Sequence, residues 1–286
     1  MGRELDPELT AAVAALIDRD PTTGLAAVAA ALGSPAVLTS AQLGVGLDVL
    51  ARALIALGHD EAANHAAAAS LDPSDAERLY RLGYQLIELG LPAVAATALE
   101  HALVHASGTE AIVTELCTAF ERQLRYADAR RLMARHPALC EAQFLCRYLL
   151  AWNAVMSGDL ATARAVAPTL VPEEPRHQAM AERIAAMLAR AARVAPVTTL
   201  DDRDLRGWHH VTVGGVLLHR SPYGLDAPMR GRYAWLQDSC ALIASGVAQL
   251  AAVLVVWQWT PPCVYALPGR DHEAVARVVA HQLGVP

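Results

Sequence analysis

The spacing of hydrophobic residues along the chain predicts helices over most of its length. The apolar positions are filled mainly by alanine and leucine, which favour close-packed helices over a β-sandwich, and only 5% of the residues are aromatic. One helix pair is predicted at 7–17 and 22–32, and further antiparallel pairs run from about Ala41 to about Val194. A long helix at 176–193 is expected to cover the last apolar face of this stack of helix pairs, as such a stack requires.

Small residues recur at a fixed interval within this helical region. In three segments spaced 34 residues apart, a turn residue is followed five positions later by an alanine, and an earlier copy at 57–63 lies 32 residues before the first. A glycine at the turn ends the first helix, and a small residue where two helices cross lets their axes approach closely. The turn residues are Gly90, Leu124 and Gly158, and the alanines are Ala95, Ala129 and Ala163.

This 34-residue unit resembles the tetratricopeptide repeat. The resemblance implies a small residue in the turn and an alanine at the crossing, with Gly83 in a first helix and Ala102 late in a second helix. The chain departs from that pattern at Leu124, which replaces the turn glycine, and at Cys117, which takes the place of Gly83. The expected fold is therefore mainly α, a tetratricopeptide-like solenoid of antiparallel helix pairs.

The composition of the sequence changes near residue 195, so we predict two domains, at 1–195 and 196–286. Four of the five tryptophans lie in the second segment, where seven arginines balance seven acidic residues. Strand-like and helical patterns alternate there, which predicts that a small α/β domain follows the solenoid. The predicted strands are at 209–220, 253–257 and 263–267, and the predicted helices are at 199–206, 232–250 and 271–283.

The segment 209–220 carries histidines that suggest a ligand site. If Gly214 and Gly215 form a primed turn, the segment becomes a hairpin in which His210 lies opposite His219, with Cβ atoms about 4.5–5.5 Å apart. Two histidines at that distance could share a ligand or a metal ion. No third metal ligand is evident, however, and we predict no metal site. The alternatives are a partly solvated hairpin face, or a helix in place of the hairpin.

Arginines and tyrosines cluster directly after this segment and before a predicted helix. Helix N-termini attract anions, and arginines there could clamp a phosphate or a carboxylate. The alternative is a connecting loop whose arginines pair with nearby acidic residues. The candidate ligand-binding residues in this cluster are Arg220, Tyr223, Arg230, Arg232 and Tyr233.

Another candidate ligand site is the turn before the last predicted helix, which contains Arg270, Asp271 and His272. It follows a predicted strand, which is the usual place for a ligand in open α/β sheets. Asp271 is a candidate N-cap, and His272 is a candidate acid or base. The alternative is a capped turn with no ligand.

Composition and charge exclude several classes of function. All 23 basic residues are arginine, so no lysine can form a Schiff base or serve a phosphate loop. The formal net charge is −6 and positive charge forms no run, so we expect neither nucleic acid nor membranes as partners. Five scattered cysteines and a polar N-terminus predict a cytoplasmic protein with free thiols. No cofactor is predicted.

The leading hypothesis is a scaffold or adaptor that binds a protein or peptide partner in the groove of the helical array, with the C-terminal domain capping the array. Motifs such as Gly-x-Ser-x-Gly and His-Glu-x-x-His are absent, which favours binding over catalysis. The alternative is an enzyme or small-molecule sensor with a His/Arg-lined site in the C-terminal domain. The tryptophans there could also bury a homodimer interface. The predicted groove residues, taken from the first helices of the pairs, are Tyr80, Tyr84, Glu115, Arg122, Arg147 and Asn153.

Overall fold

The protein is mainly helical, as the hydrophobic pattern predicts. The computed structural model describes residues 7–33, 35, 38–106, 109–217 and 239–286. Contacts divide the chain into two compact units, Met1–Ile184 and Ala185–Pro286. None of the helices in the described ranges combines the length and apolar character needed to cross a membrane.

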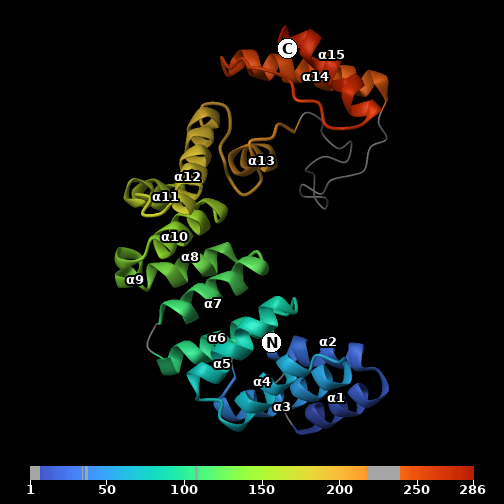
Figure 1. Cartoon of the computed structure of the whole chain (residues 1–286), viewed down its shortest axis with the longest axis vertical. Helices are drawn as coiled ribbons and strands as arrows, with labels where there is room; N and C mark the ends of the chain where they lie inside the picture. The colour runs from blue at the N-terminus through green and yellow to red at the C-terminus, as the bar shows by residue number, and fades with distance from the viewer. Residues whose placement is uncertain (1–6, 34, 36–37, 107–108, 218–238) are drawn as a thin grey trace. The chain divides into compact units, whose positions relative to one another are not determined.

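The first unit is a series of helices in which each packs against its neighbours in sequence (Figure 1). The predicted helices at 7–17, 22–32 and 176–193 are confirmed as α1, α2 and α12. The helices of this unit are α1 (Pro7–Arg19), α2 (Pro21–Leu32), α3 (Ser40–Ala56), α4 (Asp60–Leu71), α5 (Ala76–Glu88), α6 (Pro92–Ala106), α7 (Glu110–Arg122), α8 (Tyr126–Ala134), α9 (Pro137–Ala142), α10 (Phe144–Met156), α11 (Leu160–Val166), the 3₁₀ turn η1 (Ala167–Thr169) and the first half of α12 (Pro175–Val194).

Four of the helix pairs are joined by the same kind of turn. In each turn, the N–H that follows the turn residue donates to a carbonyl five residues earlier, at 2.8–2.9 Å. The turn residue has a left-handed backbone, with φ between 59° and 83°, which only glycine adopts without steric cost. The four turn residues are Gly58, Gly90, Leu124 and Gly158, so the sequence repeat corresponds to a repeated backbone structure.

The alanines that follow these turns are buried where the two helices of a pair meet. Ala95, Ala129 and Ala163 have no exposed surface. In the α5–α6 pair, a Cβ added at Gly83 would lie only 2.5 Å from Cγ of Leu99. Small side chains at these positions therefore permit the close approach of the helix axes that the repeat predicts.

The N-terminal helices α1 and α2 belong to the same packed unit. α2 packs against α3 and also reaches α6. The hydroxyl of Thr97 on α6 donates to the carbonyl of Leu32, the last residue of α2, at 2.6 Å, and both residues are buried. This contact fixes the end of α2 on the helical array. The α1–α2 pair covers the apolar face at the N-terminal end of that array.

The second unit contains the end of α12 together with α13 (Leu205–Val213), α14 (Cys240–Val256) and α15 (Arg270–Leu283). α15 confirms the predicted final helix, and Gly284 ends it with a φ of 67°. The predicted helix at 232–250 begins outside the described residues, and the observed helix extends past its predicted end. The described part of this unit contains no strand, so the α/β prediction finds no support there.

The hairpin predicted at 209–220 is wrong for its described part, because His209 and His210 lie on α13. The side chain of Asp204 caps this helix by accepting from the N–H of Gly207 at 2.8 Å, and the helix predicted at 199–206 therefore starts later. Gly214 ends α13 with a φ of 79°, and its N–H donates to the carbonyl of His210. A glycine with positive φ suits a helix end as well as a primed hairpin turn. The local sequence was therefore compatible with both structures, and the hairpin prediction was the wrong one.

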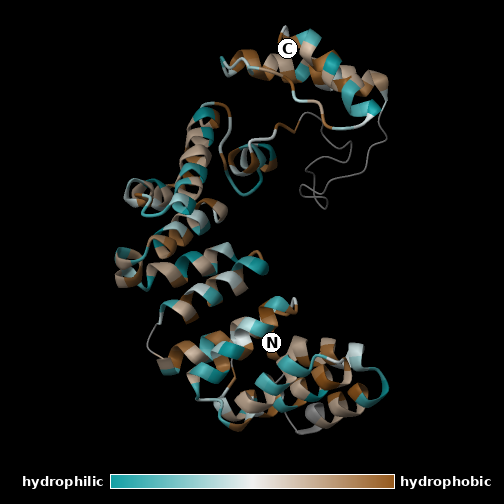
Figure 2. Ribbon diagram, viewed as in Figure 1, coloured by the Kyte–Doolittle hydropathy of each residue, from teal (hydrophilic) through white to brown (hydrophobic). Residues whose placement is uncertain are grey.

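The other two predicted strands are also wrong. Residues 253–256 continue α14, with Trp257 as its C-cap. Residues 263–267 form a loop and no strand, and the N–H of Val264 donates to the carbonyl of Pro286 at 2.8 Å. The run of valines in 253–256 has high β-propensity, but it extends an apolar helix of 17 residues that contains no charged side chain. Figure 2 shows hydrophobic colour along most of α14. Length, rather than propensity, decided the element type here.

Candidate functional site

Three of the predicted groove residues lie together on neighbouring helices of the first unit. Tyr80 and Tyr84 are one turn apart on α5, with Glu88 one turn further on, and Glu115 lies on α7, which packs against α5. Tyr84 is 46% exposed, and Tyr80 and Glu115 are half-buried. We refer to Tyr80, Tyr84, Glu88 and Glu115 as the Tyr–Glu face.

The Tyr–Glu face carries negative charge that no described cation balances. Burial raises the pKa of Glu115, and the nearby charge of Glu88 raises it further. Burial also raises the pKa of Tyr80, and the carboxylate of Glu115 adds to that shift. Within the described ranges, Glu88 and Glu115 form neither an ion pair nor a hydrogen bond. A cation bound here would relieve the repulsion and stabilise both carboxylates.

Two other predicted groove residues are arginines with different surroundings. Arg122 is the exposed last residue of α7. Arg147 instead donates through Nη1 to the carbonyl of Glu141 at 2.9 Å, and its Nη2 pairs with Glu173 at 2.8 Å. Its guanidinium also lies 5.9 Å from the ring centroid of Phe144. These contacts hold α10 against α9 and against the segment before α12. The guanidinium of Arg147 therefore binds other parts of the helical array.

The last predicted groove residue, Asn153, is fully buried. Its Nδ2 donates to the carbonyl of Leu149 at 2.9 Å and to the carboxylate of Glu121 at 2.6 Å, and it lies 3.3 Å from the sulfur of Cys117. Burial raises the pKa of Glu121, while the hydrogen bonds from Asn153 and Cys117 act in the opposite direction. Asn153 therefore belongs to a polar contact that joins α7 and α10 inside the array.

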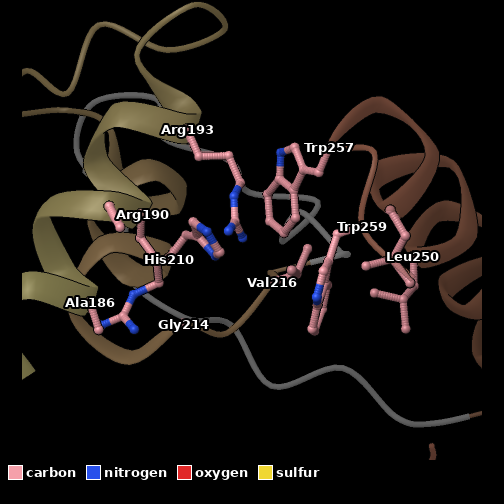
Figure 3. A pocket seen from close by; sticks show the side chains of 11 residues that line it. Ala186, Arg190, Arg193, His210, Gly214, Val216, Leu250, Trp257 and Trp259 are labelled. Atoms are coloured by element: carbon pink, nitrogen blue, oxygen red, sulfur yellow. The ribbon is translucent and has the colours of Figure 1, made fainter. Parts of the chain in front are cut away.

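A second candidate site is a pocket of about 670 Å³ within the second unit (Figure 3). Its walls come from the end of α12, from α13 and the residues after it, and from α14 and the residues after it. Most of its lining is apolar or aromatic, and two arginines and one histidine supply its charged or ionisable groups. The pocket is lined by Ala186, Ala189, Arg190, Arg193, His210, Gly214, Val216, Leu250, Leu254, Trp257 and Trp259.

His210 is the buried polar residue of this pocket. Its side chain is 5% exposed, and its ring lies 4.3 Å from that of Trp257, centroid to centroid. Neither ring nitrogen has a hydrogen-bond partner of good geometry among the described residues. Burial lowers the pKa of His210, and the charges of Arg190 and Arg193 lower it further, against the opposing effect of the Gly214 and Gly215 backbone. The ring is therefore mainly neutral near pH 7, with one donor and one acceptor.

The two arginines of the pocket have different roles. Arg190 donates through Nε to the carbonyl of Val211 at 2.9 Å and through Nη2 to that of Thr212 at 3.3 Å, so it holds α13 against α12. Arg193 is exposed, and its guanidinium lies 6.0 Å from the ring centroid of Trp257. Figure 3 shows Arg193 beside His210 and Trp257. Neither arginine forms an ion pair in the described part of the chain.

Sequence reasoning identified His210 but missed both arginines, because they lie on the helix expected only to cap the array. A signal was present. Arg190 and Arg193 are three positions apart, which places them on one helix face, and no acidic residue lies within four positions of either. Unbalanced arginines on one face of a helix are a mark of an anion site or of an interface.

The remaining predicted ligand residues are not brought into this pocket. Arg270, Asp271 and His272 are exposed at the start of α15, where the N-cap is Gly269 rather than Asp271. The Nδ1 atom of His272 lies 3.0 Å from the carbonyl oxygen of Pro268. The other predicted ligand residues, His219, Arg220, Tyr223, Arg230, Arg232 and Tyr233, lie outside the described residues.

The described residues contain no group of three histidine, cysteine or acidic side chains that could hold a metal ion. Comparison of the chain with protein-family models, with curated proteins and with solved structures finds no match. The function must therefore be argued from the two sites themselves.

Proposed function

We propose that this protein is a helical-repeat adaptor that binds a protein or peptide partner through the Tyr–Glu face. The observation that supports this proposal is the arrangement of two tyrosines and two unpaired carboxylates on adjacent helices α5 and α7. Repeated helix pairs commonly present such extended surfaces to a partner. Tyrosine adds contact area with little conformational entropy to lose, which suits a binding surface.

The charge of the face points to a basic partner segment. The net charge of −6 comes from residues 1–195, because the seven arginines and seven acids beyond them cancel. An arginine or lysine of the partner could pair with Glu115 and Glu88 and lie over the ring of Tyr84. Opposite charge would also raise the association rate at low ionic strength.

The test begins with crosslinking and affinity capture by the full chain and by the Glu88→Gln/Glu115→Gln variant. A partner is retained for study only if the variant reduces its recovery. Peptides that tile the partner are then titrated by calorimetry. We expect a basic peptide to bind the wild type and to lose about tenfold in affinity with the variant, or about 1.4 kcal/mol.

The matched control is Glu141→Gln, which removes an exposed carboxylate at the end of α9, away from the Tyr–Glu face. It should leave the affinity of the peptide unchanged. A partner peptide that is acidic or neutral, or one that binds the Glu88→Gln/Glu115→Gln variant as tightly as the wild type, would contradict the proposal.

A further inference from the structure

Beyond partner binding, we infer that the second unit binds a small planar aromatic carboxylate in the pocket formed by α12, α13 and α14. Three features of the described part of the pocket lead to this ligand class: a buried histidine whose ring nitrogens have no hydrogen-bond partner of good geometry, arginines without counter-ions, and apolar walls with two indole rings.

His210 calls for a ligand because its two ring nitrogens are buried and neither has a hydrogen-bond partner of good geometry among the described residues, although the backbone of Gly214 and Gly215 lies near the ring. Buried polar groups in native proteins nearly always have a partner, since an unsatisfied one loses the hydrogen bonds it made to water. The neutral ring offers one N–H donor and one acceptor into the pocket. A carboxylate oxygen would accept from the N–H.

Arg193 identifies the charge of the ligand. Its guanidinium faces the ring of Trp257 at the edge of the pocket, and no carboxylate is among the residues that line the pocket. Arg190 adds positive charge, although its Nε and Nη2 are already bound to backbone carbonyls of α13. One available guanidinium with a planar fork matches a single carboxylate, which it can bind through two parallel hydrogen bonds.

The walls of the pocket identify the body of the ligand. Trp257 and Trp259 supply aromatic surface, while Val216, Leu250 and Leu254 supply aliphatic surface. Figure 3 shows Trp257, Trp259 and Val216 around the same space as His210 and Arg193. The volume of about 670 Å³ lies in the range usual for small-molecule sites. A flat aromatic ring would bury apolar area against the indoles, and a doubly charged phosphate would lose more hydration than this lining restores.

The test is calorimetric titration of the full chain with 2-naphthoate at pH 7.5. Two probes serve as comparisons: 2-naphthylmethanol keeps the rings and lacks the charge, and cyclohexanecarboxylate keeps the charge and lacks the aromatic ring. We expect 2-naphthoate to bind saturably with one site per chain. Each comparison probe should bind at least about tenfold more weakly than 2-naphthoate. Inorganic phosphate at millimolar concentration should not displace it.

The variants Arg193→Gln and His210→Phe localise the site. Arg193 is exposed, so its replacement should leave the fold intact, and phenylalanine at 210 retains an aromatic ring against Trp257 while removing both nitrogens. We expect Arg193→Gln to weaken 2-naphthoate binding about tenfold, and His210→Phe to weaken it by a smaller factor. Arg277→Gln, which removes an exposed arginine on α15 outside the pocket, is the matched control and should bind like the wild type.

Three results would overturn the inference. The first is the absence of saturable 2-naphthoate binding by the wild type. The second is equal binding of 2-naphthylmethanol, or displacement by phosphate, because either would remove the carboxylate or the aromatic ring from the recognition. The third is unchanged binding by a folded Arg193→Gln variant. None of these results bears on the Tyr–Glu face, so the adaptor proposal stands or falls separately.

Discussion

Leu124 occupies a backbone conformation that suits glycine. Its φ is 59°, and it stands in the turn position that glycine holds at Gly58, Gly90 and Gly158. A left-handed backbone costs a residue with a Cβ about 1–2 kcal/mol. The side chain of Leu124 is 74% exposed, so burial recovers little of that cost. The turn is kept because the carbonyl of Phe120 accepts the N–H of Arg125 at 2.9 Å, as in the glycine-containing copies.

We therefore expect Leu124→Gly to stabilise the protein by about 0.5–1 kcal/mol, measured by urea unfolding. The converse change, Gly90→Ala, should destabilise the protein by about 1 kcal/mol, because a residue with a Cβ is strained at a φ of 75°. A Cβ added at Gly90 meets no atom within 4 Å, so no steric clash adds to this cost. Leu124→Ala is the control, since it removes the side chain while retaining the Cβ, and it should give no comparable gain. A destabilised Leu124→Gly variant would show that the leucine side chain contributes more than its exposure indicates.

Glu121 makes stability depend on pH. Burial raises its pKa above the ordinary 4.5, so between that value and its folded-state pKa the native protein holds a proton that the unfolded chain has lost. Wild-type stability from this group therefore falls as pH rises through that interval. Glu121→Gln keeps an acceptor for Asn153 and has no proton to lose. The variant should accordingly gain stability relative to the wild type as pH increases.

The measurement is urea unfolding of both proteins at several pH values, from about pH 5 to about pH 8. The difference in unfolding free energy should change by at most about 1.4 kcal/mol per pH unit, the limit for one proton. Glu141→Gln corrects for the loss of one negative charge from the array. A difference that stays flat, or that favours the wild type at higher pH, would refute the assignment.

At the scale of elements, one hydroxyl makes a buried hydrogen bond between α6 and the end of α2. Thr97→Val keeps the shape of the side chain and removes the donor to the carbonyl of Leu32. A buried carbonyl left without a partner costs about 1–3 kcal/mol, so this is the expected loss in unfolding free energy, followed by thermal or urea unfolding. Thr97→Ser, which keeps the donor, should lose less. Equal losses in the two variants would mean that the methyl group, and not the hydrogen bond, is the important contact.

The misread elements all lie in the second unit. In the first unit, α5 and α7 have strongly amphipathic patterns, and the repeated turns mark where helices end, so local and tertiary preferences agree. In α13 and α14 they do not. The glycine at 214 and the valines at 253, 255 and 256 are each compatible with a hairpin or a strand, so these residues alone do not distinguish a strand from the helix that is observed.

At the scale of the whole molecule, the two units differ in how deeply their helices are buried. α5 and α6 hold many fully buried residues, whereas α15 has no buried residue and α14 has only Gly246, Val247 and Leu254. Amide protection follows the free energy of local opening, which falls where few apolar contacts hold a helix.

Hydrogen exchange followed by mass spectrometry should therefore find the amides of α5 and α6 at least about 100-fold more protected than those of α15. Peptides from α1 and α2 serve as an internal control for terminal helices within the first unit. Equal protection of α15 and α5 would indicate that α15 is covered in solution, as a homodimer through the second unit would require.

The sequence by itself determined the helical class, the positions of the repeated turns and the burial of Ala95, Ala129 and Ala163, because each depends on periodicity and on backbone conformations that few residues adopt. It also placed tyrosines and a glutamate on first helices. Only the tertiary structure decided that Glu115 on α7 lies near Glu88 on α5, and that Arg193 and His210 meet Trp257 in one pocket. The reason is physical: these residues come from different helices, and no local pattern records which faces of separate helices pack together.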